Sequence, residues 1–245
     1  MQRIISKVKI TLQQLQLAIK GEVVMSEELA STLLAVYDAK VPHSWVFTVA
    51  GDEFSWILPT LGLWFSSLLQ RDEQLRTWLN HGRPNSYWLP GFSNPQGLLT
   101  AMKQEVTRRH KADKWALDDV VYHTEVTSYE RPEQIRSPPS EGIYVYGLSL
   151  EGAGWNKIEG TLVESEAKKL FVPLPVLHVT ANTKSEEFKV RKDIFGTQGP
   201  YEAPCYKYPC RTDRFMVMMV TLKGGDRPPT HWALRGTALL CNIEG

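Results

Sequence analysis

The sequence has few cysteines and almost no net charge, and both shortages exclude whole classes of protein. Its 245 residues include three cysteines, and 28 Lys and Arg oppose 27 Asp and Glu, which leaves a net charge of +1. Three cysteines are too few for a secreted disulfide scaffold. A chain without a basic field is not suited to nonspecific binding of nucleic acid or anionic lipid. Because hydrophobic residues still make up 42%, we expect a globular, intracellular protein with a real core.

Motifs for nucleotide binding and hydrolysis are also missing. A P-loop requires a Gly-Lys dipeptide, which occurs nowhere, and the patterns G-x-G-x-x-G, H-E-x-x-H and G-x-S-x-G are absent too. The periodic N-terminal stretch contains Lys7, Lys9 and Lys20, so it fits neither a signal peptide nor a membrane span. The sequence therefore predicts no catalytic residue, no cofactor and no membrane segment.

The three cysteines, together with one histidine, could form one metal site. Cys205, Cys210 and Cys241 with His231 supply three thiolates and one imidazole, which is a possible zinc ligand set. The five-residue step from Cys205 to Cys210 is wider than the usual zinc pairs, and Cys241 ends an apolar run in which a thiol packs as a small hydrophobe. We expect no metal.

One of the cysteines could instead be a catalytic thiol. Cys210 lies next to Arg211 and close to Arg214, and neighbouring cations lower the pKa of a thiol. No partner that would complete such a site is evident in the sequence, and we expect Cys210 to be inert.

The first part of the chain has the apolar period of helices. Apolar residues recur at steps of three and four, at Ile4, Val8, Leu12, Leu15 and Ile19. Gly21 is placed to end this helix, and Ser26 is placed to cap the next one. We expect Leu29, Leu33 and Leu34 to form the buried stripe of the second helix.

Two further helices are predicted before residue 112. The pattern from Thr60 to Gly82 indicates a long helix, for which we expect a break near Arg71. Asn94 followed by Pro95 is typical of an N-cap and a first helical residue.

Beyond Trp115 the apolar period changes to that of strands. Strands are predicted at 120–126, 143–150, 176–180, 215–222 and 237–243. The nearly unbroken apolar run of 215–222 indicates a strand covered on both faces. Helices followed by strands predict an α+β fold: a helical subdomain at 1–112 and an antiparallel β-barrel or sandwich-like subdomain at 113–245.

Several tryptophans lie among aliphatic residues, which favours packing over catalysis. We predict that Trp64, Trp78, Trp88 and Phe92 anchor the helical part or an interface. Sequence alone does not separate these two roles.

The same segments resemble a known family. In the helical part the residues that carry the resemblance are Val24-Met25-Ser26, Val41-Pro42 before Trp45, the run Trp64, Leu68, Arg71, Leu75, Trp78, Gly82 and Pro84, and Trp88-Leu89-Pro90-Gly91-Phe92. In the sheet part they are Tyr144-Val145-Tyr146-Gly147-Leu148, Leu174-Pro175-Val176, and the ending Pro229, His231-Trp232, Arg235-Gly236 and Ala238-Leu239-Leu240-Cys241. Over nearly its whole length the chain resembles the C-terminal region of dynein heavy chains, and residues 206–213 resemble the axonemal outer-arm, gamma-like type. Pro90 departs from the family pattern, in which serine is usual.

The resemblance implies a mechanical role for this chain. It implies a fragment of a much larger heavy chain that packs on the ring of AAA+ modules of the same heavy chain, and that contacts the microtubule only through the parent ATP-driven motor. The implied location is the cytoplasm and cytoskeleton, in the axoneme of a cilium or flagellum. Nucleic acid and membrane are not among the implied partners.

Two alternatives remain open from the residues. Tyrosines suited to stacking suggest a stand-alone barrel that binds an oligonucleotide or peptide; they are Tyr144, Tyr146, Tyr201, Tyr206 and Tyr208. Apolar surface that is bare without a parent chain predicts that the chain dimerises.

Overall fold

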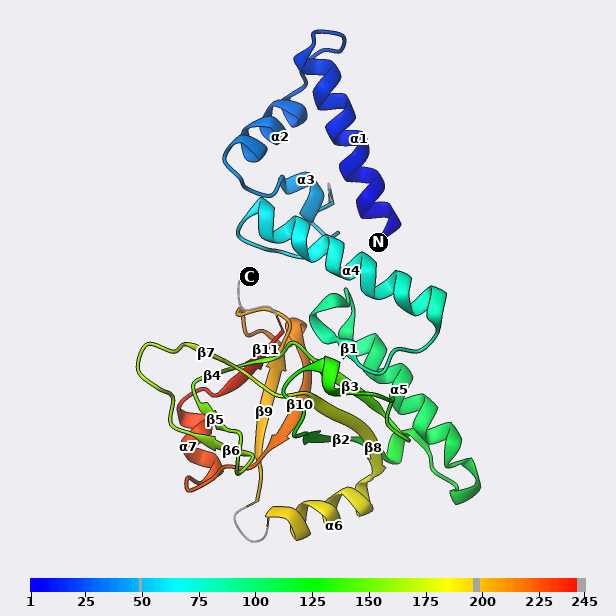
Figure 1. The fold of residues 1–245 in the computed structure, drawn as a ribbon, viewed down its shortest axis with the longest axis vertical. Helices are drawn as coiled ribbons and strands as arrows, with labels where there is room; N and C mark the ends of the chain where they lie inside the picture. The colour runs from blue at the N-terminus through cyan, green and yellow to red at the C-terminus, as the bar shows by residue number, and fades with distance from the viewer. Residues whose placement is uncertain (49, 196–198, 242–245) are drawn as a thin grey trace. The chain divides into compact units, whose positions relative to one another are not determined.

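The structure is a computed structural model that describes residues 1–48, 50–195 and 199–241. The chain divides into two compact units: a helical unit, residues 1–80, and a mixed unit that begins at His81. Figure 1 shows the course of the chain from the blue helices near the N-terminus to the red strand β11. The described helices are α1 (Gln2–Ile19), α2 (Glu27–Tyr37), α3 (His43–Val46), α4 (Leu61–His81), α5 (Pro95–Arg109), α6 (Lys184–Phe195) and α7 (Pro229–Leu234). The described strands are β1 (Tyr87–Trp88), β2 (Val120–Val126), β3 (Ile143–Tyr146), β4 (Ser149–Glu151), β5 (Gly154–Asn156), β6 (Thr161–Val163), β7 (Phe171–Pro173), β8 (Leu177–Thr183), β9 (Tyr201–Tyr206), β10 (Met216–Leu222) and β11 (Ala238–Leu240).

The helix ends of the helical unit are set by local chemistry, as predicted. Gly21 follows the C-cap residue Lys20 of α1 and has φ +79°, a left-handed conformation that glycine adopts without strain. The Ser26 hydroxyl accepts a hydrogen bond from the Leu29 N–H at 3.3 Å and so caps α2. Thr60 caps α4 in the same way, by accepting from the Leu63 N–H at 3.3 Å.

Two predictions for the helical unit were wrong. The helix α4 continues without a break through Arg71, because this side chain is buried and its Nε donates to Ser67 Oγ at 3.0 Å. A charged residue within the apolar stripe interrupts the sequence pattern but not the helix. In α2, Leu33 is 37% exposed and Leu34 is 63% exposed, whereas Leu29 and Thr32 are buried.

The described strands of the mixed unit form three sheets. One sheet has the strand order β1-β3-β8-β2, a second has β10-β9-β11-β4-β7, and the third consists of β5 and β6. Helix α5 begins at Pro95, where the Asn94 side chain accepts from the Gly97 N–H at 3.0 Å, as its sequence predicts. Leu99, Met102 and Val106 form the buried side of this helix.

The α+β class is confirmed, but the antiparallel barrel is not. In the part of the chain that the structure describes, no sheet closes on itself, and β1 with β3 and β11 with β9 are parallel pairs. Strands β2 and β10 lie at the ends of the two larger sheets and do not pair through their backbones. Instead, the Thr221 N–H of β10 donates a hydrogen bond to the Thr124 hydroxyl of β2 at 2.9 Å. The contact between the two sheets is therefore made through a side chain, and the described sheets are not joined by backbone hydrogen bonds.

The predicted strand at 143–150 is divided in two. Gly147 lies between β3 and β4 with φ +89°, and a Cβ there would lie 2.6 Å from Trp88 Cδ1. The close approach of the indole and the left-handed backbone both require glycine. The predicted strand at 237–243 is shorter in the structure, because β11 spans Ala238–Leu240 and neither Thr237 nor Cys241 belongs to it; residues 242 and 243 lie outside the described residues.

The predicted subdomain boundary at 112 stays a prediction. The two compact units divide at residues 80 and 81, and α5 belongs to the mixed unit. Strands other than the short β1 begin only after residue 119, where the apolar period changes.

Candidate docking surface

The helical unit has an aromatic core built around Trp64. Its buried members are Ile4, Val8, Trp45, Trp56, Trp64 and Leu68. The indole of Trp64 lies 5.6 Å from the ring of Trp45 and 5.4 Å from the ring of Phe65, and Trp64 is 0% exposed. Burial of such large apolar rings is the main source of stability in a small helical unit. Trp64 is therefore an internal anchor and offers no surface to a partner.

Polar groups inside this core hold the rings in place. Ser55 Oγ donates to the Trp45 carbonyl at 2.8 Å and accepts from Trp64 Nε1 at 3.4 Å. The Arg71 guanidinium carbon lies 4.1 Å from the ring centre of Trp56, the geometry of a cation–π contact. These contacts tie α4 to the segment between α3 and α4.

Trp78 lies further along α4 and is half-buried. It lines an open cavity of about 620 Å³ with Asp72, Leu75, Arg76 and Leu79 among its walls. Leu79 is 85% exposed, and the Asp72–Arg76 ion pair lies one helical turn earlier. Of the four predicted residues, Trp78 is the one in the helical unit that reaches an accessible surface.

Trp88 and Phe92 belong to the mixed unit. Trp88 pairs with Tyr146 in the parallel β1–β3 ladder, and Phe92 lies 6.1 Å from the ring of Tyr87. Both side chains are half-buried. They fasten the short β1 segment to the sheet. The four predicted residues are thus divided between the two units, with Trp64 and Trp78 in the helical unit and Trp88 and Phe92 in the mixed unit.

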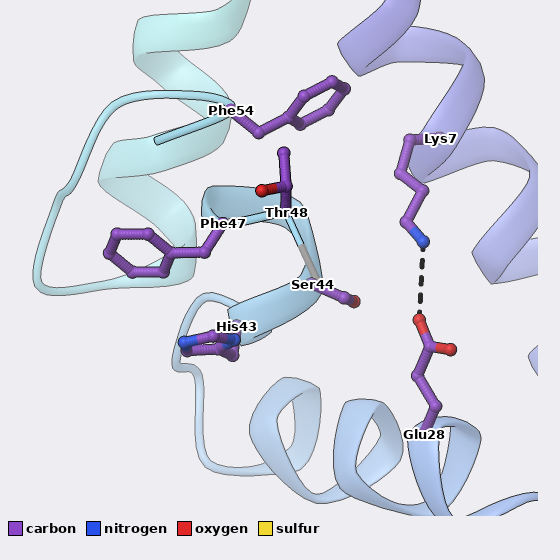
Figure 2. Close-up of a pocket in the computed structure, with 7 residues that line it drawn as sticks. All are labelled: Lys7, Glu28, His43, Ser44, Phe47, Thr48 and Phe54. Atoms are coloured by element: carbon purple, nitrogen blue, oxygen red, sulfur yellow. Dashed lines mark hydrogen bonds and ion pairs between the residues drawn. The ribbon is translucent and has the colours of Figure 1, made fainter. Parts of the chain in front are cut away.

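A second cavity of the helical unit, of about 480 Å³, lies beside α1, α2 and α3. Figure 2 shows Lys7 from α1 and Glu28 from α2 as an ion pair on one side of it, with side chains of α3 and the following segment forming the other walls. Lys7 Nζ lies 3.4 Å from Glu28 Oε1. Phe47 and Phe54 are the aromatic walls, and Ser44 Oγ is buried without a hydrogen-bond partner among the described residues. The cavity thus combines an exposed ion pair with apolar rings.

Large apolar side chains lie on the outside of the helical unit, where the sequence predicts bare apolar surface but does not identify the residues that form it. The most exposed are Val24 at 86%, Tyr37 at 86%, Leu79 at 85%, Leu69 at 69%, Leu34 at 63%, Ile19 at 62% and Ile10 at 53%. A signal was present in α1, because Ile10 lies off the face defined by Ile4, Val8 and Leu15. Apolar residues on more than one helix face are typical of a helix that packs on both sides.

The cysteines do not form the zinc site that was considered. Cys205 and Cys241 are buried, Cys210 is exposed, and His231 Nε2 contacts Glu164 Oε1 at 2.8 Å. Among the described residues, no group of three or more His, Cys, Asp or Glu side chains has the arrangement to hold a metal ion. A hydrogen bond with Cys241, together with burial, raises the pKa of the Cys205 thiol well above its ordinary value, which suits a packing role.

The cations near Cys210 are engaged elsewhere. Arg211 donates to the Gly236 carbonyl and to the Glu151 carboxylate, and Arg214 lies over the ring of Phe215 at 5.8 Å. The arrangement proposed for a reactive thiol is therefore not assembled around them.

The tyrosine platform of the alternative function is also incomplete. Tyr201 is 6% exposed and donates its hydroxyl to the Thr237 carbonyl, and Tyr208 is 3% exposed. Buried rings are not available to stack on bases. In addition, none of the described helices combines the length and apolar character needed to cross a membrane.

Comparisons with known proteins connect these features to a family. The family model described as the C-terminal domain of the dynein heavy chain matches residues 1–241. The chain is 46% identical to dynein axonemal heavy chain 8 of Homo sapiens over 246 residues and 44% identical to dynein axonemal heavy chain 5 of Mus musculus over 245, in each case across 100% of this chain. It is 42% identical to the dynein gamma chain, flagellar outer arm, of Chlamydomonas reinhardtii across 96% of this chain.

The chain spans 5% of the length of each of these relatives. The resemblance that the tryptophan-rich segments and the last strand suggest is confirmed, including the likeness to axonemal heavy chains and to the gamma chain. The chain belongs to the family of C-terminal domains of dynein heavy chains.

Proposed function

We propose that this chain is the noncatalytic C-terminal part of an axonemal dynein heavy chain, and that it packs on the AAA+ ring of that heavy chain. The whole heavy chain would be an ATP-driven motor that acts on microtubules in the axoneme of a cilium or flagellum. The observation that carries this proposal is similarity to axonemal heavy chains over 96–100% of the chain, at 42–46% identity.

The exposed apolar side chains of the helical unit support a docking role. Tyr37 and Leu34 lie three residues apart on α2, so they share one helix face, and both are more than half exposed. Covering such side chains with a partner removes apolar surface from water, which favours association. Packed interfaces of this kind move between discrete arrangements, and a brace of this kind would couple the modules it contacts.

Binding to the rest of the heavy chain is the direct test. A heavy-chain ring that lacks its C-terminal region would be mixed with the 245-residue chain, and the dissociation constant measured by sedimentation. The double variant Leu34→Asp with Tyr37→Asp should weaken binding by about tenfold or more, because charged groups resist desolvation. Leu234→Asp in the mixed unit, where the leucine is 90% exposed, is the matched control and should bind as the wild type does.

Two outcomes would overturn the docking proposal. One is a wild-type chain that does not bind the ring at micromolar concentration, and the other is a control variant that loses as much affinity as the double variant. Sedimentation of the chain alone would show the self-association that exposed apolar surface also predicts.

The noncatalytic part of the proposal has a separate test. The isolated chain should release no phosphate from ATP above a heat-treated sample, because the P-loop sequence is absent. Turnover that survives further purification and follows the chain through a sizing column would contradict it.

A further inference from the structure

A cavity of about 280 Å³ in the mixed unit has features of a binding site and no part in the proposed docking. It lies among β2, the end of β10, the end of α6 and the β5–β6 turn. Its walls include the rings of Trp155 and Phe195 and the side chain of Leu222, and its polar members include His123, Glu125 and Lys223. Pockets for drug-sized ligands measure roughly 300–1,000 Å³, so this one fits a fragment and excludes a nucleotide.

A buried carboxylate fixes one side of His123. The Glu187 side chain is 5% exposed and accepts hydrogen bonds from His123 Nδ1 at 2.8 Å, Asn182 Nδ2 at 3.0 Å and Arg191 Nε at 2.7 Å. Burial alone would raise the pKa of Glu187, but the three donors outweigh it and lower this pKa to about 2. Glu187 is therefore a carboxylate at neutral pH, and His123 Nδ1 must carry a proton.

The other ring nitrogen of His123 is left without a partner. No residue that the structure describes accepts from or donates to His123 Nε2, although the side chain is only 18% exposed and lines the cavity. The hydrogen bond to Glu187 raises the pKa of His123 against the opposing effect of burial. The imidazolium form, in which Nε2–H is a donor, is thus favoured in mildly acidic solution.

The charges around the cavity cancel. Glu187 and Glu202 are offset by Arg191, which bonds both, and by protonated His123. At the rim, Glu125 and Lys223 are both exposed, have opposite charges and have no ion-pair partner among the described residues. A charged ligand would upset this balance, whereas a neutral group that accepts one hydrogen bond would complement it.

We propose that this cavity binds a small neutral molecule or side chain with an apolar or aromatic body and one carbonyl oxygen, and that His123 Nε2–H donates to that oxygen. Trp155, Phe195 and Leu222 would contact the apolar body. Glu187 acts as a positioning residue, because it holds the imidazole and its proton without contacting the ligand.

Three probes of similar shape test the proposal on the wild-type protein at about pH 6, where the imidazolium form is favoured. Acetophenone has the carbonyl, benzoate replaces it with an anion, and cumene lacks the acceptor. Binding would be followed by ¹H–¹⁵N spectra, in which shifts of the Trp155 indole N–H and the His123 ring report on this cavity. Acetophenone should bind about tenfold more tightly than either of the others, as expected for one charge-assisted hydrogen bond.

A pair of histidine variants separates the hydrogen bond from the cavity shape. In His123→Asn the amide nitrogen takes the place of Nδ1 and keeps a donor for Glu187, while Nε2 is removed. This variant should lose the preference for acetophenone over cumene. His231→Asn is the control, because His231 is bound to Glu164 and does not line this cavity.

The wild-type comparison alone can overturn the proposal, whether or not the variants fold. It fails if acetophenone does not bind at millimolar concentration, if cumene or benzoate binds as tightly, or if the shifts lie away from Trp155 and His123. A capped phenylalanine amide, tested beside acetophenone, would tell whether the carbonyl comes from a polypeptide or a free molecule. Failure here would leave the docking proposal unaffected, since the two tests use different units.

Discussion

Trp64 of α4 stacks on Trp56, with ring centroids 5.3 Å apart and ring planes at 18°. This pair ties the helix to the long segment before it, and Trp78 on the same helix lies instead at an open cavity. One helix therefore places one tryptophan in the core and another at the surface.

Replacement of these two tryptophans should separate stability from docking. Trp64→Ala should lower the free energy of unfolding of the helical unit by about 3–5 kcal/mol, as for other buried aromatic side chains. Trp78→Ala should lower it by about 1 kcal/mol, a typical value for a partly exposed site. Urea unfolding followed by circular dichroism measures both, and equal losses would show that the assignment of core and surface is wrong.

Two serines of the helical unit provide a matched pair for hydrogen bonding. Ser55→Ala should destabilise by about 1–3 kcal/mol, since the Trp45 carbonyl and Trp64 Nε1 both lose a buried partner. Ser44→Ala should leave stability unchanged or raise it, because the buried Ser44 Oγ has no partner among the described residues. Thermal unfolding of the two variants decides, and a larger loss for Ser44→Ala would contradict the structure.

The buried Glu187–His123 pair predicts how stability depends on pH. The pKa of Glu187 is lowered to about 2, so its contribution is complete above the ordinary carboxyl range and is lost as pH falls through about 2. The pKa of His123 is raised, so its contribution is complete below about 6.5 and is lost as pH rises through the raised value. The free energy of unfolding of the mixed unit should therefore be greatest between the ordinary carboxyl range and about pH 6.5, where both contributions are complete.

A single variant isolates this effect from other titrating groups. His110, which contacts Asp113 and Glu141, also has a raised pKa and adds its own loss on the alkaline side. Glu187→Gln should reduce stability at about pH 5 and flatten the difference between about pH 5 and about pH 8, as measured by unfolding midpoints. An unchanged slope would mean that the pair does not determine the pH dependence.

Two glycines with left-handed backbone provide a steric comparison. Gly160→Ala should cost about 1–2 kcal/mol for its φ of +64° alone, because nothing lies within 4 Å of the added Cβ. Gly147→Ala should cost more, since its Cβ would meet the Trp88 ring at 2.6 Å. The difference in unfolding free energy, together with a shift of the Trp88 indole resonance for Gly147→Ala only, checks this prediction.

Local chemistry made part of the fold predictable from sequence. Ser26 and Asn94 were identified as caps because a cap depends on a hydrogen bond three residues away. The strand order was not predictable, because β1 and β3 are joined through residues 87 and 145, which lie far apart in the chain. Helix α6 was missed, since its buried residue is Glu187 while Phe188 is 71% exposed, the reverse of an amphipathic pattern.

The candidate site was predictable only in its residue types. Tryptophans on an apolar helix face predict packing. The apolar pattern treats Trp64 and Trp78 alike, although Trp64 lies in the core and Trp78 at the surface. The pocket of His123 was not foreseen, because its partner Glu187 is 64 residues away in sequence and only the fold brings them together. The resemblance to relatives was enough to identify the family. The positions of these side chains in the core, at the surface or in a pocket could be seen only in the structure.

The bond from the Thr221 N–H to the Thr124 hydroxyl has a consequence for solubility. Strands β2 and β10 each end a sheet, and an exposed strand edge invites pairing with another polypeptide. Here the two edges face each other, and the Thr221 amide of β10 is satisfied by the Thr124 hydroxyl of β2 instead of by a backbone carbonyl. The two sheets thereby shield each other from intermolecular strand addition, without being joined into a continuous ladder.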